Sequence, residues 1–483
     1  MAYTYKDVCE NSPYNIDYCP TKFADLHILV IPVWFTDSSN YISIAKKEDV
    51  RDDIEKVYFG DPDEIGWHSV RSFYEQESLD SIFFEGEATP WYECGKSSTE
   101  FYSESSGKEA TLQLVQDAVD WYFGDDTASR LEYDSDQNGF LDAVHLIYAA
   151  PDYQCLRNGE AGNLWAYSFW LQKTSLKKPA SPGPNQFFWA SYDFIYGRNA
   201  LTRTGHQYAN GDTDYCTLDS HTFIHEMGHV FGLDDYYDYV RMYLNPAGAF
   251  SMQDHNVGGH DPYSVLAFGW CDPYIPTDSC SLKIRPFQET HDLILLTPEW
   301  NDYDSPFDEY LLLELYTPTG LNQHDCEHKY DSYPKGPNAT GIRLWHVDAR
   351  LTHCEGARKD GTPIWSEDLV TYPDYPSRYG VRTAMTNTCE GASYGSPLGE
   401  DYYIYDLLHM IRNSESEPLQ TDSFLNSTHL FKNGDSFAMS DFSSQFPEGD
   451  LLDSGRDLGW TFNVEIEGEN ESAIATINLT RTN

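Results

Sequence analysis

The chain has 483 residues, 40% of them hydrophobic and 15% aromatic, so it is long enough for about two or three domains and too apolar to be disordered. Lys and Arg total 31 and Asp and Glu total 78, which gives a net charge of −47. This charge repels phosphate backbones and excludes a nucleic-acid partner. The longest apolar run, at 26–35, contains Pro32 and is too short for a membrane span.

The first half of the chain alternates predicted strands and helices. A run rich in β-branched residues begins it and is typical of a strand buried on both faces. Apolar residues at helical spacing follow, most clearly at 108–123. In chain order, the predicted elements cover 26–35, 47–59, 67–77, 81–88, 108–123 and 143–150. This alternation predicts an α/β layer that extends to a helix near His221.

Beyond about Trp270 the pattern changes to strands separated by Pro, Gly, Asn and Asp turns. The predicted strands cover 293–296, 309–315, 341–347, 462–466 and 473–479. The stretch 360–399 is dense in Pro, Tyr, Ser and Gly and predicts a long irregular insertion. We therefore expect an α/β (α+β) domain at 1–275 and a β-rich, sandwich-like domain at 276–483.

The sequence HEMGH lies in a segment that is expected to form one helix, with Asp219 or Ser220 as its N-cap. On a helix, His225 and His229 project from the same face one turn apart, so both imidazoles can reach one metal ion. Glu226, beside them, can contact a water molecule at that ion. This spacing predicts a zinc site.

Gly232 and Asp235 extend the motif to HExxHxxGxxD. A glycine can leave a helix in a left-handed conformation and turn the chain so that Asp235 faces the same ion. Asp234 and Asp238 are alternative third ligands. Three protein ligands leave a zinc position open for water, as in catalytic sites, whereas a structural site fills it with Cys or His.

Such a site predicts hydrolysis of peptide bonds. Zn²⁺ lowers the pKa of water that it binds toward ~7, and Glu226 would accept the proton as hydroxide attacks a carbonyl group. Glu226 would then protonate the leaving amine. An oxyanion donor is also expected, and the sequence does not rank its candidates, which are Tyr236, Tyr237, His255, His260 and Tyr263.

Four separate parts of the chain resemble the immune inhibitor A family of secreted zinc metallopeptidases. The similar segments are SVRSFYEQESL, HEMGHVFGLDDYYD, AFSMQDHNVGGHDPYSVLAFGW, and DEYLLLEL with GIRLWHVD. The resemblance implies a zincin-like catalytic domain in which His225, His229 and Asp235 bind zinc. It also implies that Glu226 is the base and that Met252 forms a hydrophobic floor beneath the metal. The ten cysteines and the 360–399 insertion depart from the family pattern.

The sequence DSDQNGFLD at 134–142 predicts a stabilising calcium loop. Oxygen ligands at alternate positions can wrap a hard cation, and Gly139 permits the sharp turn. His145 stands where an EF-hand has a bidentate Glu, so the affinity is expected to be lower or a further ligand is needed. The expected ligands are Asp134, Asp136, Asn138, the carbonyl group of Phe140, and Asp142. The alternative is an ordinary surface turn.

The ten dispersed cysteines are typical of a disulfide-bonded secreted protein. The local pairs to consider are Cys9 with Cys19, Cys271 with Cys280, and Cys326 with Cys354. Glycosylation sequons begin at Asn338, Asn426, Asn470 and Asn478. Residues 1–9 carry no signal-peptide features. Because the cysteines indicate export, we expect a secreted chain from which the signal has been removed. A cytosolic protein with reduced thiols is the alternative.

The sequence therefore predicts a secreted zinc endopeptidase that acts on protein or peptide substrates and contains structural calcium. An extracellular adhesion or carbohydrate-binding protein with purely structural metal sites is the alternative. His346 follows Trp345 in a predicted strand, and we expect it to be packed and hydrogen-bonded rather than catalytic.

Overall fold

A computed structural model describes residues 1–10, 24–103, 107–152, 164–171, 174–196, 218–330, 335–359, 363–373, 380–388 and 404–482. The chain divides into two compact units. The α/β unit comprises Tyr14–Gly232 and Lys329–Ser332. The β unit comprises Met1–Pro13, Leu233–His328 and Tyr333–Asn483. Each is described separately below.

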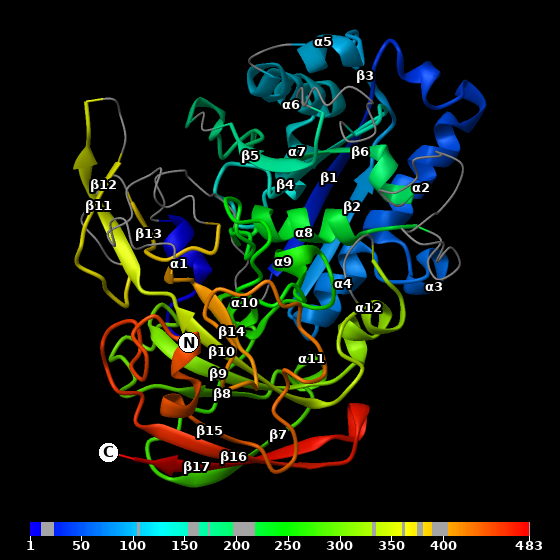
Figure 1. Ribbon diagram of the computed structural model, residues 1–483. Coiled ribbons are helices and arrows are strands. Elements are labelled where there is room, and N and C mark those ends of the chain that lie inside the picture. Colours follow the sequence, from blue (N-terminus) through cyan, green and yellow to red (C-terminus); the bar gives the residue numbers. More distant parts are fainter. Residues whose placement is uncertain are drawn as a thin grey trace. The chain divides into compact units, whose positions relative to one another are not determined.

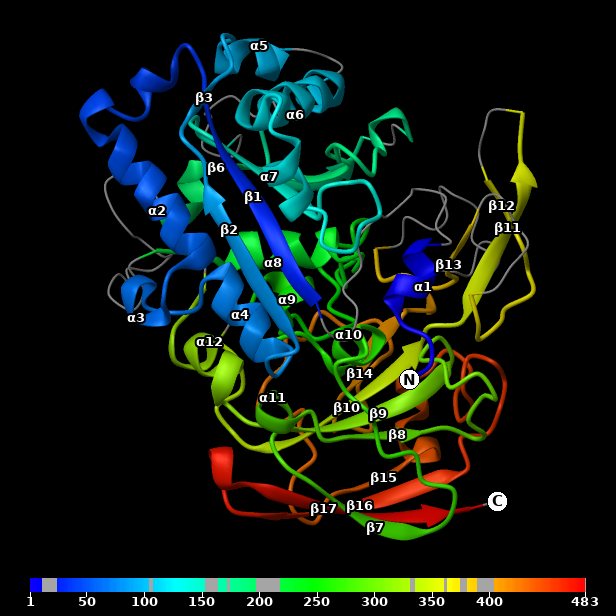
Figure 2. The same ribbon diagram turned by 180° about the vertical axis from the view of Figure 1, so that it is seen from behind.

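The α/β unit is built on a six-stranded sheet with the order β2-β1-β4-β6-β5, in which β3 also pairs with β1. Strand β1 is parallel to β2, β3 and β4, and β4 is parallel to β6 (Figures 1 and 2). The edge strand β5 is antiparallel to β6. The strands are β1 Ala24–Trp34, β2 Ile82–Ala88, β3 Tyr92–Glu93, β4 Ala143–Tyr148, β5 Tyr167–Trp170 and β6 Gln186–Ser191.

Helices cover both faces of this sheet (Figure 1). Side chains alternate along β1, and Leu29 and Ile31 share one buried cluster with Val115 and Val119 of α6. Helices α2, α4 and α8 pack on the opposite face, against β2, β5 and β6. The helices are α2 Lys47–Phe59, α3 Pro62–Ile65, α4 Val70–Glu77, α5 Ser98–Ser103, α6 Gly107–Phe123, α7 Thr127–Glu132 and α8 His221–Val230. Short 3-10 turns cover Ser38–Asn40, Ile44–Lys46, Thr174–Leu176 and Tyr192–Tyr196.

Several elements of the α/β unit lie where hydrophobic spacing predicts them. Helix α2 has its predicted bounds and buries Val50, Ile54 and Val57 on one face. Strands β5 and β6 were not predicted, although every residue of β6 is buried. None of the helices in the described part of the chain has the length and hydrophobicity that a membrane span requires.

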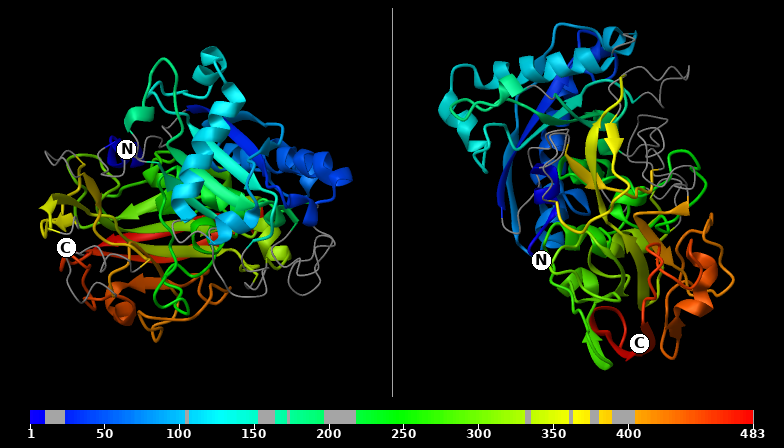
Figure 3. Two further views of the ribbon diagram at one scale, coloured as in Figure 1. Left: turned by 90° about the horizontal axis from the view of Figure 1, so that it is seen from above. Right: turned by 90° about the vertical axis from the view of Figure 1, so that its left-hand side faces the viewer.

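The β unit contains two four-stranded antiparallel sheets with the orders β14-β10-β9-β8 and β15-β16-β17-β7. Seen from above, the red strands of the second sheet lie beneath the green strands of the first (Figure 3). The strands are β7 Cys280–Ile284, β8 Leu293–Leu296, β9 Glu309–Tyr316, β10 Gly341–Asp348, β14 Leu408–Ile411, β15 Ser436–Ala438, β16 Trp460–Glu467 and β17 Ile474–Arg481. Short helices are α1 Tyr5–Glu10, α9 Met252–His255, α10 Pro262–Ala267, α11 Phe287–Thr290 and α12 Gln323–Glu327.

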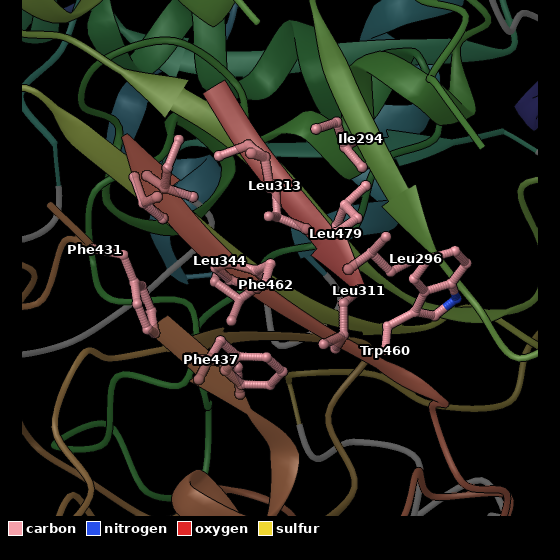
Figure 4. Packing of buried hydrophobic residues seen from close by; sticks show 14 of the residues in the cluster. Ile294, Leu296, Leu311, Leu313, Leu344, Phe431, Phe437, Trp460, Phe462 and Leu479 are labelled. Atoms are coloured by element: carbon pink, nitrogen blue, oxygen red, sulfur yellow. The ribbon is translucent and has the colours of Figure 1, made fainter. Parts of the chain in front are cut away.

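The two sheets share one hydrophobic core (Figure 4). Leu313 and Leu344 enter it from one sheet, and Phe462 and Leu479 enter it from the other. Burial of each large apolar side chain stabilises the fold by about 2 kcal/mol relative to exposure. The two sheets of the β unit therefore pack around a hydrophobic core of their own.

The division between the two units falls at Gly232 and not near residue 275. The segment 233–275 joins the β unit because strands of that unit satisfy its backbone groups. The guanidinium group of Arg343 donates a hydrogen bond to the carbonyl oxygen of Phe250 at 3.0 Å. The backbone N–H of Met410 donates to the carbonyl oxygen of Pro246 at 2.9 Å. The amino-acid composition of the segment does not predict these long-range contacts.

The predicted irregular insertion at 360–399 contains two short strands among its described residues. These are β12 (Pro363–Trp365) and β13 (Val381–Thr383), and both pair antiparallel with β11 (Leu351–Ala357). The stretches 360–362, 374–379 and 389–399 lie outside the described residues. The described part of the insertion is therefore partly a β-structure.

Two of the three local disulfide pairs are not formed. Cys280 carries a thiol at the first residue of β7, opposite Leu479 of β17, and is not joined to Cys271. Cys326 and Cys354 both carry thiols and are not joined to each other. The thiol of Cys326 instead donates a hydrogen bond to the carbonyl oxygen of Pro337 at 3.4 Å. For the third pair, Cys19 lies outside the described residues.

Candidate active site

Helix α8 carries the HEMGH sequence and is held at both ends within the α/β unit. Ser220 is the N-cap residue, but the carboxylate of Asp219 accepts the hydrogen bond from the backbone N–H of His221 at 3.0 Å. At the other end, the amide of Gln186 on β6 donates to the carbonyl oxygen of Val230 at 2.7 Å. These contacts satisfy helix-terminal groups that would otherwise lack partners.

The sheet-facing side of α8 is tightly packed. The ring of Phe223 lies edge-on to those of Tyr58 and Phe188, with centroids 5.6 and 5.7 Å apart. The hydroxyl of Tyr74 donates to the carbonyl oxygen of Ile224 at 2.8 Å. The packing fixes the rotation of the helix, and therefore the direction of the histidines on its other side.

His225 and His229 face each other on α8. Their Nε2 atoms are 3.1 Å apart, and the rings are nearly perpendicular, at 88°. Two nitrogen ligands of a tetrahedral zinc ion, each at about 2.05 Å, lie about 3.3 Å apart. The observed separation is close to this value. The pair therefore fits a zinc ion without movement of the helix backbone.

Glu226 lies beside the two histidines and is buried, at 7% exposure. The hydroxyl of Ser168, on the edge strand β5, donates to its carboxylate at 3.0 Å and lies 3.1 Å from its backbone carbonyl oxygen. The edge strand therefore orients the Glu226 side chain. Sequence reasoning missed Ser168, because the segment YSFW carries no catalytic motif and its contact with Glu226 arises only from folding.

A buried Tyr–His pair supports α8 from the sheet. The hydroxyl of Tyr58 on α2 lies 2.8 Å from Nδ1 of His145 on β4. Burial lowers the pKa of His145 to about 3. Burial also raises the pKa of Tyr58 well above its usual value, and the charge of Glu226 adds to this effect. His145 is thus a neutral core residue and is not available at the twelfth position of the calcium loop.

We expect His145 to make the protein sensitive to acid. Its folded pKa of about 3 lies below the unfolded value of about 6.5, so its contribution to stability is complete above pH ~6.5 and falls as the pH drops toward 3. Between pH 6.5 and 5, the wild type should lose about 1.5 kcal/mol more than His145→Gln. Urea unfolding at both pH values measures this, with the half-exposed His328→Gln as control. Equal pH dependence in wild type and His145→Gln would contradict the assignment.

The backbone turns after α8, since Gly232 has a φ of 99°. Asp235 follows three residues later, at the start of the β-unit segment, and is 5% exposed. Its carboxylate accepts a hydrogen bond from the hydroxyl of Tyr239. A buried carboxylate of this kind requires compensation by donors or a cation.

The two alternative third ligands have different surroundings. Asp234 is exposed. Asp238 is buried, and its carboxylate accepts hydrogen bonds from the backbone N–H groups of Val240 and Arg241 at 2.8 and 2.7 Å. It also pairs with the Arg241 guanidinium group at 2.6 Å. Asp238 therefore caps the following loop, and Asp235 is the acid of the three best suited to a metal.

Of the tyrosine candidates for an oxyanion donor, two are core residues of the β unit. The hydroxyl of Tyr236 lies 2.9 Å from that of Ser264. The hydroxyl of Tyr263 lies 3.2 Å from that of Tyr5 on α1. Both side chains are fully buried, and burial raises the pKa of each well above its usual value. Tyr237 is only half-buried.

The histidine candidates also have partners within the β unit. Nε2 of His260 lies 3.3 Å from Oε1 of Gln253, and His260 is fully buried. Nδ1 of His255 pairs with the carboxylate of Asp254. Met252 is fully buried at the first residue of α9, so it is a hydrophobic core residue of this segment.

The predicted calcium loop brings three carboxylates together in the α/β unit. Oxygen atoms of Asp134, Asp136 and Asp142 all lie within 4.8 Å of one another. Gly139 has a φ of 90°, as the predicted turn requires. The backbone N–H of Ser135 donates to Asp142 at 2.9 Å. The loop therefore forms a candidate cation site.

The other two predicted calcium ligands are placed differently. The side-chain oxygen of Asn138 accepts a hydrogen bond from the backbone N–H of Phe140 at 2.8 Å, which stabilises the turn. Phe140 itself forms an isolated β-bridge with Gly183. Burial raises the pKa of Asp142 to about 7 and also raises that of Asp134. Asp134 and Asp142 are thus poorly solvated, whereas Asp136 is exposed.

Comparison with known proteins supports a metallopeptidase relationship. No family model matches the chain. The chain is 26% identical over 204 residues to Pre-pro-metalloprotease PrtV from two strains of Vibrio cholerae serotype O1. The match covers 38% of this chain and 20% of those proteins, so the chain spans about a fifth of the length of these relatives. Part of this chain is therefore similar in sequence to a metalloprotease.

Proposed function

We propose that this chain is a secreted zinc endopeptidase of the immune inhibitor A-like group, with a zincin-like catalytic domain. The observation that carries the proposal is the pair of Nε2 atoms of His225 and His229, 3.1 Å apart on one helix, with the buried Glu226 beside them. The similarity to a metalloprotease supports the same chemistry.

His225, His229 and Asp235 are the proposed zinc ligands. The two imidazoles have a separation suited to one ion, and Gly232 turns the chain between the helix and Asp235. An imidazole pair with one carboxylate is a donor set that catalytic zinc uses. When bound, zinc acts as a Lewis acid that activates water and polarises a carbonyl group.

Glu226 is the proposed general base. Its carboxylate would accept a proton from the attacking water and deliver it to the nitrogen of the leaving amine. The hydrogen bond from Ser168 holds the carboxylate in one orientation, which lowers the cost of reaching the reactive geometry. The carboxylate and the positioning hydroxyl come from different elements, α8 and β5.

The edge strand β5 offers a binding surface for an extended protein or peptide substrate. It pairs with β6 on one side, and no second partner strand is present among the described residues. An extended peptide can add to such an edge through backbone hydrogen bonds. Because Ser168 of β5 contacts Glu226, a peptide bound there would lie close to the proposed base.

Removal of zinc is the direct test of the proposed function. We expect a zinc-selective chelator to abolish cleavage of unfolded casein and stoichiometric Zn²⁺ to restore it, with excess Ca²⁺ present throughout. A matched sample that receives Ca²⁺ alone controls for the calcium loop. An adhesion or carbohydrate-binding protein would show no zinc-dependent cleavage, and full activity in zinc-free protein would disprove the proposal.

We also propose that Asp134, Asp136 and Asp142 bind Ca²⁺. At a concentration 100-fold above its dissociation constant, Ca²⁺ should stabilise the protein by about 2.7 kcal/mol. Asp134→Asn should lose most of this gain, because it removes a charged ligand from the loop. Asp125→Asn, an exposed acid in the same unit, should retain it. Thermal unfolding with and without Ca²⁺ measures the effect, and equal melting temperatures in the wild type would count against the site.

A further inference from the structure

A third group of metal-type side chains lies in the β unit. Glu309 is the first residue of β9, His346 is on β10, and Asp453 is in the loop before β16. One ligand atom from each lies within 4.8 Å of the others. Glu309 Oε1 and His346 Nε2 are 3.0 Å apart. The sequence predicts only a packed role for His346.

Strand pairing explains how Glu309 and His346 meet. In the antiparallel register of β9 and β10, Glu309 lies opposite Asp348, two residues beyond His346. Diagonal neighbours of this kind project from the same face of a sheet. The loop then adds Asp453, whose backbone N–H donates to the Glu309 carboxylate, as does that of Ser454 at 3.0 Å. The group is therefore held by the backbone.

Asp453 has an unusual environment. The residue as a whole is half-buried, but both of its carboxylate oxygen atoms are buried and accept no hydrogen bond from the described residues. A buried carboxylate without donors is costly, because it loses its hydration and gains nothing in return. Its carboxylate lies within 4.8 Å of ligand atoms of Glu309 and His346. A cation at this point would satisfy it.

The local charge balance also favours a dication. Asp348 is neutralised by Arg350, whose guanidinium nitrogens lie 2.8 and 2.6 Å from its carboxylate oxygens. Arg350 lies farther from Glu309, at 4.0 Å. When both are ionised, Glu309 and Asp453 place two negative charges around a histidine. A protonated His346 would cancel one of them, whereas a divalent ion beside a neutral imidazole would cancel both.

We propose that Glu309, His346 and Asp453 bind a divalent transition-metal ion of the zinc class. The donor set of one imidazole nitrogen and two carboxylates suits such an ion better than Ca²⁺, which takes oxygen ligands. The ion would join β9 and β10 to the loop before β16 and stabilise the β unit. This site does not depend on the proposed peptidase activity.

The test uses the 483-residue chain with His225→Ala and His229→Ala, which removes the proposed catalytic zinc. The protein is treated with chelator, saturated with Ca²⁺ and titrated with Zn²⁺, and bound metal is measured by mass spectrometry. We expect one equivalent of zinc. Adding Asp453→Asn should weaken binding on the order of 100-fold or more. Adding Asp450→Asn, an exposed acid in the same loop, should leave binding unchanged.

Circular dichroism checks that Asp453→Asn remains folded, and His346→Gln provides a second variant that should lose the same equivalent. Zn²⁺ should also raise the melting temperature of the Asp450→Asn protein but not that of Asp453→Asn. The proposal would be overturned if the protein with His225→Ala and His229→Ala bound no zinc, or if Asp453→Asn left zinc binding unchanged. Either result would favour a protonated His346. Failure of the peptidase proposal would appear separately, as equal zinc content in the wild type and the double-histidine variant.

Discussion

Replacement of Glu226 by Gln is expected to abolish proteolysis and leave zinc bound. The amide has the same shape as the carboxylate and can keep a contact with Ser168, but it cannot accept a proton. General-base catalysis contributes about 10² to 10⁴ in rate. We therefore expect kcat/KM for a quenched fluorescent peptide to fall by about 10²- to 10⁴-fold.

Two measurements make this result specific to catalysis. Zinc content and melting temperature should match those of the wild type, because Glu226 is not a proposed ligand. The control is Glu132→Gln, an exposed glutamate at the last residue of α7, which should keep full activity. Cleavage at the wild-type rate by Glu226→Gln would disprove the assigned mechanism.

The second large effect is expected at the third zinc ligand. Asp235→Ala should lose zinc and activity together, because two imidazoles alone hold the ion weakly, with an affinity reduced by roughly 100-fold or more. Asp234→Ala should retain both, since this neighbouring acid is exposed. Bound zinc per chain and kcat/KM at saturating Zn²⁺ are the quantities to compare.

Asp238→Ala separates a structural effect from ligand loss. This acid holds the backbone N–H groups of Val240 and Arg241, so its removal should lower the melting temperature without removing zinc. If Asp235→Ala kept one zinc per chain and normal activity while Asp238→Ala lost both, the ligand assignment would be wrong and Asp238 would take its place.

Much of the local structure follows from the sequence alone. The apolar spacing in 47–59 predicts α2, and the β-branched run at 26–35 predicts β1, because both patterns depend only on backbone periodicity. The approach of His225 to His229 is also local, since a four-residue separation on a helix places two side chains on one face. These features need no long-range contacts.

Other features depend on segments that are distant in the chain. The contact between Ser168 and Glu226 requires β5 to reach the edge of the sheet beside α8. Cys280 lies in a β-strand paired with β17, and the thiol of Cys326 donates a hydrogen bond to Pro337. The spacing of cysteines along the sequence reveals neither contact. Strand order and side-chain packing are set by the whole unit and have no local signature.

The sequence by itself therefore determined the HExxHxxGxxD motif, its helix and the principal strands, because helix and strand periods act over a few residues. Only the tertiary structure decided that His145 is a buried neutral residue beneath α8 and that residues 233–275 belong with the β unit. It also brought Glu309, His346 and Asp453 together from two strands and a loop. The physical reason is that such groups form through strand register and packing between segments that are far apart along the chain.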